Sequence, residues 1–227
     1  MKIGILTSRS GQNALKIIQA VKEGKINAEI ALLIGNKCHS DFKEIMKLNT
    51  VDSLFLNHEN FTTREKYDEA LISSFIKAEV DLVVSCSFSR ILTPKFIEYF
   101  PNSINSHPSL LPAFIGRTRE GKKPVDAAIE RGVKIIGATV HFIDKEVDNG
   151  PIIIQGVIPI QETWERNEII KKVLDLEMRI KIQALAWYAN GEIFVNNGIV
   201  NINKKKINEI NFIDENYLIY PQLDINY

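Results

Sequence analysis

Residues 2–23, "KIGILTSRSGQNALKIIQAVKE", indicate the fold class. The apolar run at 2–7 predicts a buried strand, a Ser–Gly turn follows it, and residues 12–23 have the spacing of an amphipathic helix. Because strands that alternate with helices are connected by crossovers, they lie parallel. Further buried strands are predicted at 28–35, 51–57 and 81–87, and helices at 40–48 and 64–79. The sequence therefore predicts an α/β fold, with a Rossmann-like, doubly wound, mostly parallel sheet.

The second half of the chain adds strands and ends in a long helix. Its predicted elements are a strand at 103–107, a helix at 124–131, strands at 137–144 and 151–160 joined by "KEVDNG", and a helix at 165–189. The pair Asn190–Gly191 is a helix stop signal, and a short hairpin with a polar tail is expected from about residue 192. Since no repeat or linker divides the chain, residues 1–227 are expected to form a single domain.

Composition excludes several classes of protein. The 28 basic residues balance the 28 acidic ones, so no net charge favours nucleic acid or an anionic membrane as a partner. The start has no apolar signal-peptide core, and no apolar run approaches the roughly 20 residues of a membrane span. Two cysteines, Cys38 and Cys86, are too few for a disulfide framework and lack a metal-binding pattern. A cytoplasmic protein is expected.

Polar side chains gather in "NSHPSLLPAFIG", residues 105–116. Asn105 and His107 are two apart, so on an extended strand they project to the same side. The prolines at 108 and 112 disfavour helix for the residues before them. Further along, "DNG" at 148–150 has ordinary turn chemistry. Taken one by one, these residues fit a hydrogen-bonded histidine, a strand-end cap and a hairpin turn as well as they fit catalysis.

A second candidate site lies at the first strand-to-helix turn. Backbone amides at a helix N-terminus bind anions, Gly11 would allow close approach, and Asn13 could add a donor. An ordinary turn with an N-cap is the alternative, since neither a Walker loop nor a dinucleotide fingerprint is present. His141 lies within an apolar strand and is expected to be packed there rather than to be catalytic.

Two motifs together resemble a known family. "NSHPSLLPAFIG" followed by "GATVHFIDKEVDNGPIIIQ" (137–155) is similar to the signature of folate-dependent formyltransferases, and in particular to the phosphoribosylglycinamide formyltransferases. The resemblance covers almost the entire chain, from "KIGILTSRSGQN" through "DLVVSCSFSRILTPKFI" to "WYANGEI". It implies transfer of a formyl group from 10-formyltetrahydrofolate, as co-substrate, to the amine of glycinamide ribonucleotide in de novo purine biosynthesis.

The resemblance also implies catalytic roles. Asn105, His107 and Asp148 match the family's catalytic trio. Attack of an amine on a formyl carbon creates an oxyanion, which an amide and a protonated imidazole can stabilise. An aspartate can favour the protonated imidazole and position a water that carries a proton from the attacking amine to the leaving nitrogen. No metal is required.

Substrate contacts carry over from the same resemblance. It implies a phosphate-binding N-terminal half and a folate-binding C-terminal half. The implied acceptor-binding residues are Gly11, Gln12, Asn13 and Glu177, and the implied folate-binding residues are Ser89, Arg90, Ile91 and Leu92. The chain departs from the family pattern at Gln12, where Ser is usual, at Met178, where His is common, at Ser87 and Ser89, where Gly and Met are usual, and at Ser106, where an apolar residue is common.

Several alternatives stay open. The basic stretch "RTREGKK" (117–123) resembles an insertion that could steer anionic substrates, or it is a solvated loop. "LPAFIG" and "RGVKIIGAT" also resemble 10-formyltetrahydrofolate hydrolase, although that enzyme usually carries an N-terminal regulatory domain. The acceptor could also be an amino sugar, or the chain could be a non-catalytic ligand-binding module. A methionyl-tRNA formyltransferase would need a further C-terminal RNA-binding domain. Small-molecule substrates are expected as partners, and a homodimer is left open.

Overall fold

The computed structural model describes residues 1–8, 11–37, 42, 45, 51–115, 123–203 and 218–220. The backbone falls into two compact units, Met1–Asn105 and Ser106–Tyr227. We describe each unit by itself. The sequence-based expectation of one domain over 1–227 stays a prediction.

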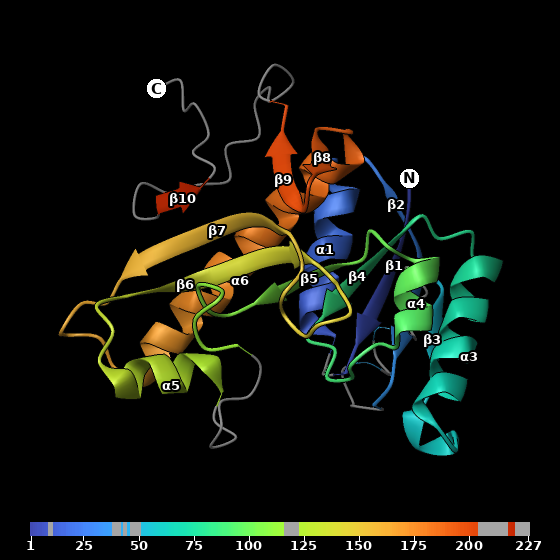
Figure 1. The fold of residues 1–227 in the computed structure, drawn as a ribbon, viewed down its shortest axis with the longest axis horizontal. Helices are drawn as coiled ribbons and strands as arrows, with labels where there is room; N and C mark the ends of the chain where they lie inside the picture. The colour runs from blue at the N-terminus through green and yellow to red at the C-terminus, as the bar shows by residue number, and fades with distance from the viewer. Residues whose placement is uncertain are drawn as a thin grey trace. The chain divides into compact units, whose positions relative to one another are not determined.

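Parallel strands form the centre of the first unit (Figure 1). Their order is β3-β2-β1-β4-β5. The bounds are β1 (Lys2–Thr7), β2 (Glu29–Gly35), β3 (Ser53–Phe55), β4 (Leu82–Cys86) and β5 (Ile104–His107). β1 pairs in parallel with both β2 and β4, and Ile5 lies opposite Leu33 on one side and Val84 on the other. β1 is thus an interior strand, and because its residues are buried on both faces of the sheet, its sequence is an almost continuous apolar run.

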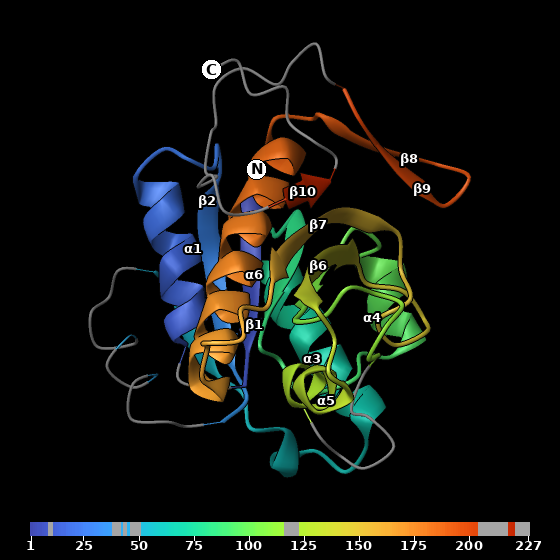
Figure 2. The ribbon, with the colours of Figure 1, turned by 90° about the vertical axis from the view of Figure 1, so that its left-hand side faces the viewer.

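Helices cover both faces of these strands. α1 (Gln12–Lys22) lies on one face, and α3 (Arg64–Lys77) and α4 (Pro94–Tyr99) lie on the other (Figure 2). α3 packs closely, because a Cβ placed on Gly4 would lie only 2.6 Å from the ring of Phe75. Glycine in the first strand therefore lets a large aromatic ring approach the sheet. A 3₁₀ turn (His58–Asn60) precedes α3.

Antiparallel strands and a long helix make up the second unit. β6 (Ile135–Phe142) and β7 (Ile152–Pro159) pair antiparallel, with Thr139 opposite Gln155, and β10 (Leu218–Tyr220) pairs antiparallel with β7. α6 (Arg166–Ala189) packs along β6 and β7, and α5 (Pro124–Arg131) contacts α6. β8 (Ile193–Asn196) and β9 (Ile199–Ile202) form a separate hairpin.

The structure confirms the predicted α/β fold with a mostly parallel sheet. It also confirms the long helix that ends at Asn190 and the hairpin after residue 192. Among the described residues, the 3₁₀ turn at His58–Asn60, α4 and β10 were not predicted. α4 has only six residues, although Thr93 as N-cap and Pro94 at the first turn are a start signal, and β10 lies in the tail that was expected to be merely polar. The predicted helix at 40–48 and the basic stretch at 117–123 fall almost entirely outside the described residues.

The remaining expectations concern cysteines and membranes. Cys86 is buried on β4, and Cys38 lies outside the described residues. None of the helices in the described part of the chain is long and apolar enough to cross a membrane.

Candidate active site

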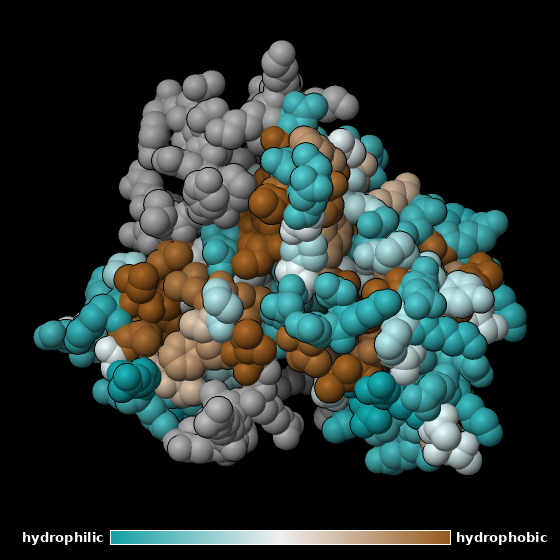
Figure 3. All heavy atoms as spheres, viewed as in Figure 1, coloured by the Kyte–Doolittle hydropathy of each residue, from teal (hydrophilic) through white to brown (hydrophobic). Residues whose placement is uncertain are grey.

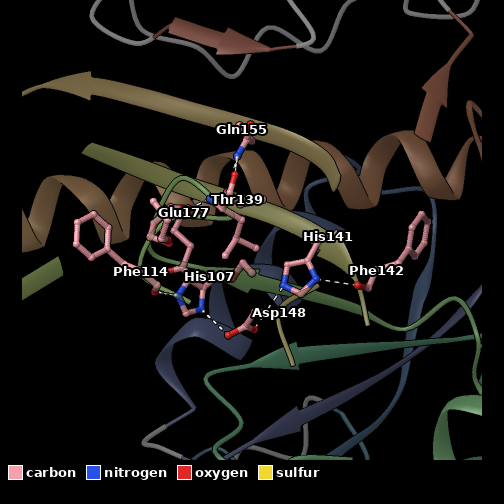
Figure 4. A network of polar contacts seen from close by, with 12 residues as sticks. His107, Phe114, Thr139, His141, Phe142, Asp148, Gln155 and Glu177 are labelled. Atoms are coloured by element: carbon pink, nitrogen blue, oxygen red, sulfur yellow. Dashed lines mark hydrogen bonds and ion pairs between the residues drawn. The ribbon is translucent and has the colours of Figure 1, made fainter. Parts of the chain in front are cut away.

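An ion pair between a strand end and a turn forms the centre of the site in the second unit. His107 ends β5, and Asp148 lies in the turn that joins β6 to β7. The Nδ1 atom of His107 is 3.2 Å from Oδ2 of Asp148, and the two side chains are only 9% and 10% exposed (Figure 4). The structure thus brings together two of the three residues that the sequence predicts to be catalytic.

The turn that carries Asp148 has a special backbone. Asp148 has a φ of 54°, in the left-handed region that few residues other than glycine and asparagine or aspartate adopt readily. Gly150 is required for a different reason, since a Cβ at this position would lie 2.0 Å from the carbonyl oxygen of Phe142. "DNG" is therefore turn chemistry, as expected, and the same turn places the carboxylate against His107.

The hydrogen bond of the second ring nitrogen of His107 determines where the ring carries a proton. Nε2 is 3.0 Å from the carbonyl oxygen of Phe114, and because a carbonyl can only accept, Nε2 must donate. If Nδ1 also carries a proton, it donates a hydrogen bond to the carboxylate of Asp148. Burial of the ring lowers its pKa, but the hydrogen bond and charge of Asp148, the Phe114 carbonyl and the charge of Glu177 together raise the pKa above 6.5. The site thus favours an imidazolium.

A second histidine faces the same carboxylate. His141 on β6 donates from Nδ1 to the carbonyl of Phe142 at 2.7 Å, and its Nε2 is 3.7 Å from Oδ1 of Asp148. The side chain is 2% exposed, and burial, only partly offset by Phe142 and Asp148, lowers its pKa below 6.5. His141 is packed in the strand, as the sequence predicts, but it also borders Asp148, which the sequence did not indicate.

A buried hydroxyl holds the loop after β5. Thr139 on β6 donates to the carbonyl of Ser109 at 2.8 Å and accepts from the backbone amide of Leu111 at 3.1 Å. Gln155 on β7 donates to Thr139 and to the carbonyl of Leu111, each at 3.0 Å (Figure 4). The loop also carries the left-handed Phe114, with a φ of 55°. This network therefore holds residues 109–111 at the start of the loop, and Phe114, whose carbonyl accepts from His107, lies further along the same loop.

Glu177 also lies in this unit, near the centre of α6. Its side chain is half-buried, and Oε1 accepts a hydrogen bond from the hydroxyl of Ser106, the residue between Asn105 and His107 on β5. The charge of Glu177 contributes to the raised pKa of His107, after the contributions of Asp148 and Phe114. The predicted acceptor-binding residue Glu177 thus lies close enough to His107 for its charge to act on the ring.

The predicted anion site belongs to the first unit. Gly11 is the N-cap of α1 with a φ of 83°, which favours glycine, and its carbonyl accepts the first helical bond from Leu15. Gln12 is exposed, and Asn13 is half-buried and donates from Nδ2 to the hydroxyl of Ser87 at 3.0 Å. A helix N-terminus with this geometry can bind an anion. The geometry is therefore compatible with the predicted role of residues 11–13, which stays a prediction.

The predicted folate-binding segment follows β4 in the same unit. Ser89, Arg90 and Ile91 are exposed, whereas Leu92 is buried. The backbone amide of Ser89 donates to the hydroxyl of Ser8 at 2.8 Å, which ties this loop to the end of β1. These assignments, and that of Asn105 at the boundary of the first unit, also stay predictions.

Sequence reasoning missed Phe114 and Thr139, and assigned His141 to packing alone. The carbonyl of Phe114 leaves no sequence signal, because any residue could supply it. Thr139 gives a weak one, since it is a polar residue within the apolar strand "GATVHF". As for metals, no group of three or more His, Cys, Asp or Glu side chains in the described ranges could hold an ion. The expectation of metal-free chemistry rests on the resemblance and stays a prediction.

Comparisons with known proteins agree with the fold. A family model described as "Formyl transferase" matches residues 1–185. A formyltetrahydrofolate deformylase from Haemophilus influenzae is 36% identical over 195 residues, covering 86% of this chain and 67% of the relative. A phosphoribosylglycinamide formyltransferase from the same organism is 31% identical over 215 residues, covering 94% of this chain and 99% of the relative.

A solved structure gives the same result. Glycinamide ribonucleotide transformylase 1 from Symbiobacterium toebii superimposes with a TM-score of 0.82 at 33% identity, covering 89% of this chain and 93% of that one. The chain belongs to the formyl transferase family, and is thus an enzyme of folate-dependent formyl transfer. Its relatives include both transferases and deformylases, which share the formylated folate and differ in what receives the formyl group.

Proposed function

We propose that the chain transfers a formyl group from 10-formyltetrahydrofolate to the amine of glycinamide ribonucleotide, a step of de novo purine biosynthesis. The observation that carries the formyl-transfer chemistry is the buried pair of His107 and Asp148, because it would stabilise an imidazolium where an oxyanion forms. The match to a transferase over 99% of that relative's length supports the choice of an amine as acceptor.

The chemistry follows from the charges of the site. The amine nitrogen attacks the formyl carbon, and the carbonyl oxygen becomes an oxyanion that the His107 imidazolium and the amide of Asn105 stabilise. The bond between the formyl carbon and N10 of the folate then breaks, and N10 takes a proton. The attacking nitrogen loses one, and Asp148 can hold a water that carries it between them.

We propose a binding role for individual residues toward each of the two substrates. The amides at the start of α1, with Gly11, Gln12 and Asn13, are proposed to bind the phosphate of the acceptor. The carboxylate of Glu177 is proposed to accept hydrogen bonds from the acceptor's ribose. The segment Ser89–Leu92 is proposed to bind the folate, with the exposed Ile91 available to pack against its apolar surface.

A specific observation favours a second candidate. The deformylase from Haemophilus influenzae is more identical to this chain than the transferase from that organism, at 36% against 31%. In a deformylase reaction, water would take the place of the amine and formate would be released. The same imidazolium would stabilise the oxyanion, so the catalytic pair alone does not choose between the two acceptors.

The test is a turnover assay with and without the amine. We expect release of tetrahydrofolate from 10-formyltetrahydrofolate to depend on glycinamide ribonucleotide. An amino sugar in place of the ribonucleotide tests the other class of amine acceptor. Release at the same rate without any amine would assign the chain as a deformylase instead.

A further inference from the structure

Ser106 is a polar residue at a position where an apolar side chain is common in the family that the chain resembles. It lies between Asn105 and His107 on β5, and successive side chains on a strand point to opposite sides. The Ser106 side chain therefore projects away from the side on which His107 lies. It is 9% exposed, and its hydroxyl bonds to Oε1 of Glu177.

The direction of this hydrogen bond is unambiguous. An ionised carboxylate can only accept, so the single hydroxyl proton of Ser106 is committed to Glu177. A half-buried charged group retains much of its freedom to rotate unless a partner fixes it, and a hydrogen bond to a charged group is stronger than one between neutral groups. Ser106 thus fixes one oxygen of the carboxylate with respect to β5.

The other carboxylate oxygen of Glu177 keeps its capacity to accept. A carboxylate offers about four lone-pair sites, of which Ser106 uses one. Among the described residues, Glu177 has no ion-pair partner and Ser106 is its one hydrogen-bonding side chain. A carboxylate whose charge reaches His107 is suited to accept hydrogen bonds from hydroxyl groups or an amine, which are the donors of a sugar-linked amine substrate.

We propose that Ser106 is a positioning residue that holds the Glu177 carboxylate in place to accept hydrogen bonds from the hydroxyl groups of the formyl acceptor. The proposal rests on the proposed function for the identity of that acceptor. Ser106 touches neither the formyl carbon nor the attacking amine, and it acts through Glu177. It therefore sets the affinity for the acceptor, while the rate of the chemical step belongs to His107 and Asp148.

A matched pair of variants isolates the hydroxyl. Ser106→Thr keeps it, and Ser106→Val has nearly the shape of threonine without it. We expect KM for glycinamide ribonucleotide to rise about tenfold in Ser106→Val and to stay within about threefold of wild type in Ser106→Thr, as for loss of a hydrogen bond to a charged group that acts indirectly. In both variants we expect kcat to stay within about threefold, and the affinity for tetrahydrofolate to be unchanged.

A double-mutant cycle tests the route through Glu177. Glu177→Gln should raise KM by at least as much as Ser106→Val, and the double variant should be no worse than Glu177→Gln alone, because the two residues act as one unit. Equal KM values for Ser106→Val and Ser106→Thr would overturn the proposal. So would additive effects in the double variant, which would mean that Ser106 acts independently of Glu177.

A second readout remains if glycinamide ribonucleotide is not the acceptor. In that case wild type shows no amine-dependent turnover, and the proposed function fails by itself. The NMR titration of His107 then tests Ser106, since the charge of a fixed Glu177 helps to raise the pKa of His107. We expect a lower midpoint in Ser106→Val than in Ser106→Thr. Identical midpoints would show that Ser106 does not position the carboxylate.

Discussion

The two polar regions of the molecule are built differently. In the second unit, His107 and Asp148 are buried, and His107 has a protein partner at each ring nitrogen. In the first unit, the groups proposed to bind ligands are a helix N-terminus and the exposed residues Ser89–Ile91. The difference indicates that the groups proposed to stabilise developing charge are preorganised by the protein, whereas the groups proposed to contact ligand stay accessible to it.

The same contrast separates two histidines that border one carboxylate. His107 has a raised pKa because Asp148, Phe114 and Glu177 together outweigh the cost of burial, whereas burial dominates at His141 and lowers its pKa. Relative to an ordinary histidine, the structure thus stabilises the charged ring at one position and the neutral ring at the other. On the face drawn in Figure 3, hydrophobic side chains gather around β6, the strand that carries His141, whereas hydrophilic side chains predominate over α3.

The largest expected effect lies in the buried region. Asp148→Asn keeps the size of the side chain but removes its charge, so His107 should lose most of its stabilisation as an imidazolium. We expect kcat to fall by roughly 10²-fold or more, the scale of a general acid–base contribution, and His107→Ala to be similarly damaging. The measurement is steady-state turnover of the purified variants, with thermal unfolding as the control for folding. Near-native turnover in both variants would mean that "DNG" forms a turn and has no catalytic role.

The network behind His107 should give a smaller loss. Thr139→Val removes a hydroxyl that bonds Ser109, Leu111 and Gln155, and so leaves buried polar groups without partners. We expect a loss of about 2 kcal/mol in the free energy of unfolding, the typical cost of an unsatisfied buried group. We expect turnover to fall about tenfold as the loop that carries Phe114 shifts. Urea unfolding and kcat measure the two effects.

Thr139→Ser is the matched control for that substitution, since it keeps the hydroxyl. It should recover most of both losses. If Thr139→Ser is as impaired as Thr139→Val, the missing methyl group rather than the hydrogen bonds would explain the effect, and the loop would not be held in the way described.

The exposed region should change binding rather than chemistry. Asn13→Ala removes the amide proposed to contact the acceptor's phosphate, and we expect KM for glycinamide ribonucleotide to rise about fivefold to tenfold with kcat nearly unchanged. Asn13 also donates to Ser87, so Ser87→Gly is the control that breaks the same bond while keeping the amide. Glycine suits this position because Ser87 has a φ of 57°. Equal KM increases in both variants would argue against a phosphate contact.

The smallest effect concerns pH, where the two histidines have opposite signs. His107 has a raised folded pKa, so its contribution to stability is full below pH 6.5 and is lost as pH rises through the folded value. His141 has a lowered folded pKa, so burying it costs stability as pH falls below 6.5 and costs nothing above that value. NMR titration should find one midpoint on each side of 6.5. Both midpoints on the same side would contradict the assignment of charges.

Much of this arrangement could be predicted from the sequence. Strand β1 and its turn into α1 follow from local periodicity and the glycine, and His107 and Asp148 from motifs that match a family. The prediction that His141 is packed within its strand was also correct. Its position against Asp148 could not be predicted, because it depends on the register of β6 against β7 and on the depth of the turn between them.

Other features leave no local signal at all. The partner of His107 Nε2 is a backbone carbonyl, whose position depends on the left-handed conformation of Phe114 rather than on its side chain. The bond between Ser106 and Glu177 joins residues 71 positions apart. Such contacts are set by packing, so a single sequence could identify Ser106 as unusual without indicating what it binds.

The central claim is that the formyl group goes to an amine rather than to water. The most direct test is a single turnover with 10-formyltetrahydrofolate that carries a labelled formyl group, in the presence of saturating glycinamide ribonucleotide. The account predicts that nearly all of the label appears in formylglycinamide ribonucleotide, in equal amount to the tetrahydrofolate released. Label recovered as formate, with the ribonucleotide unchanged, would contradict it.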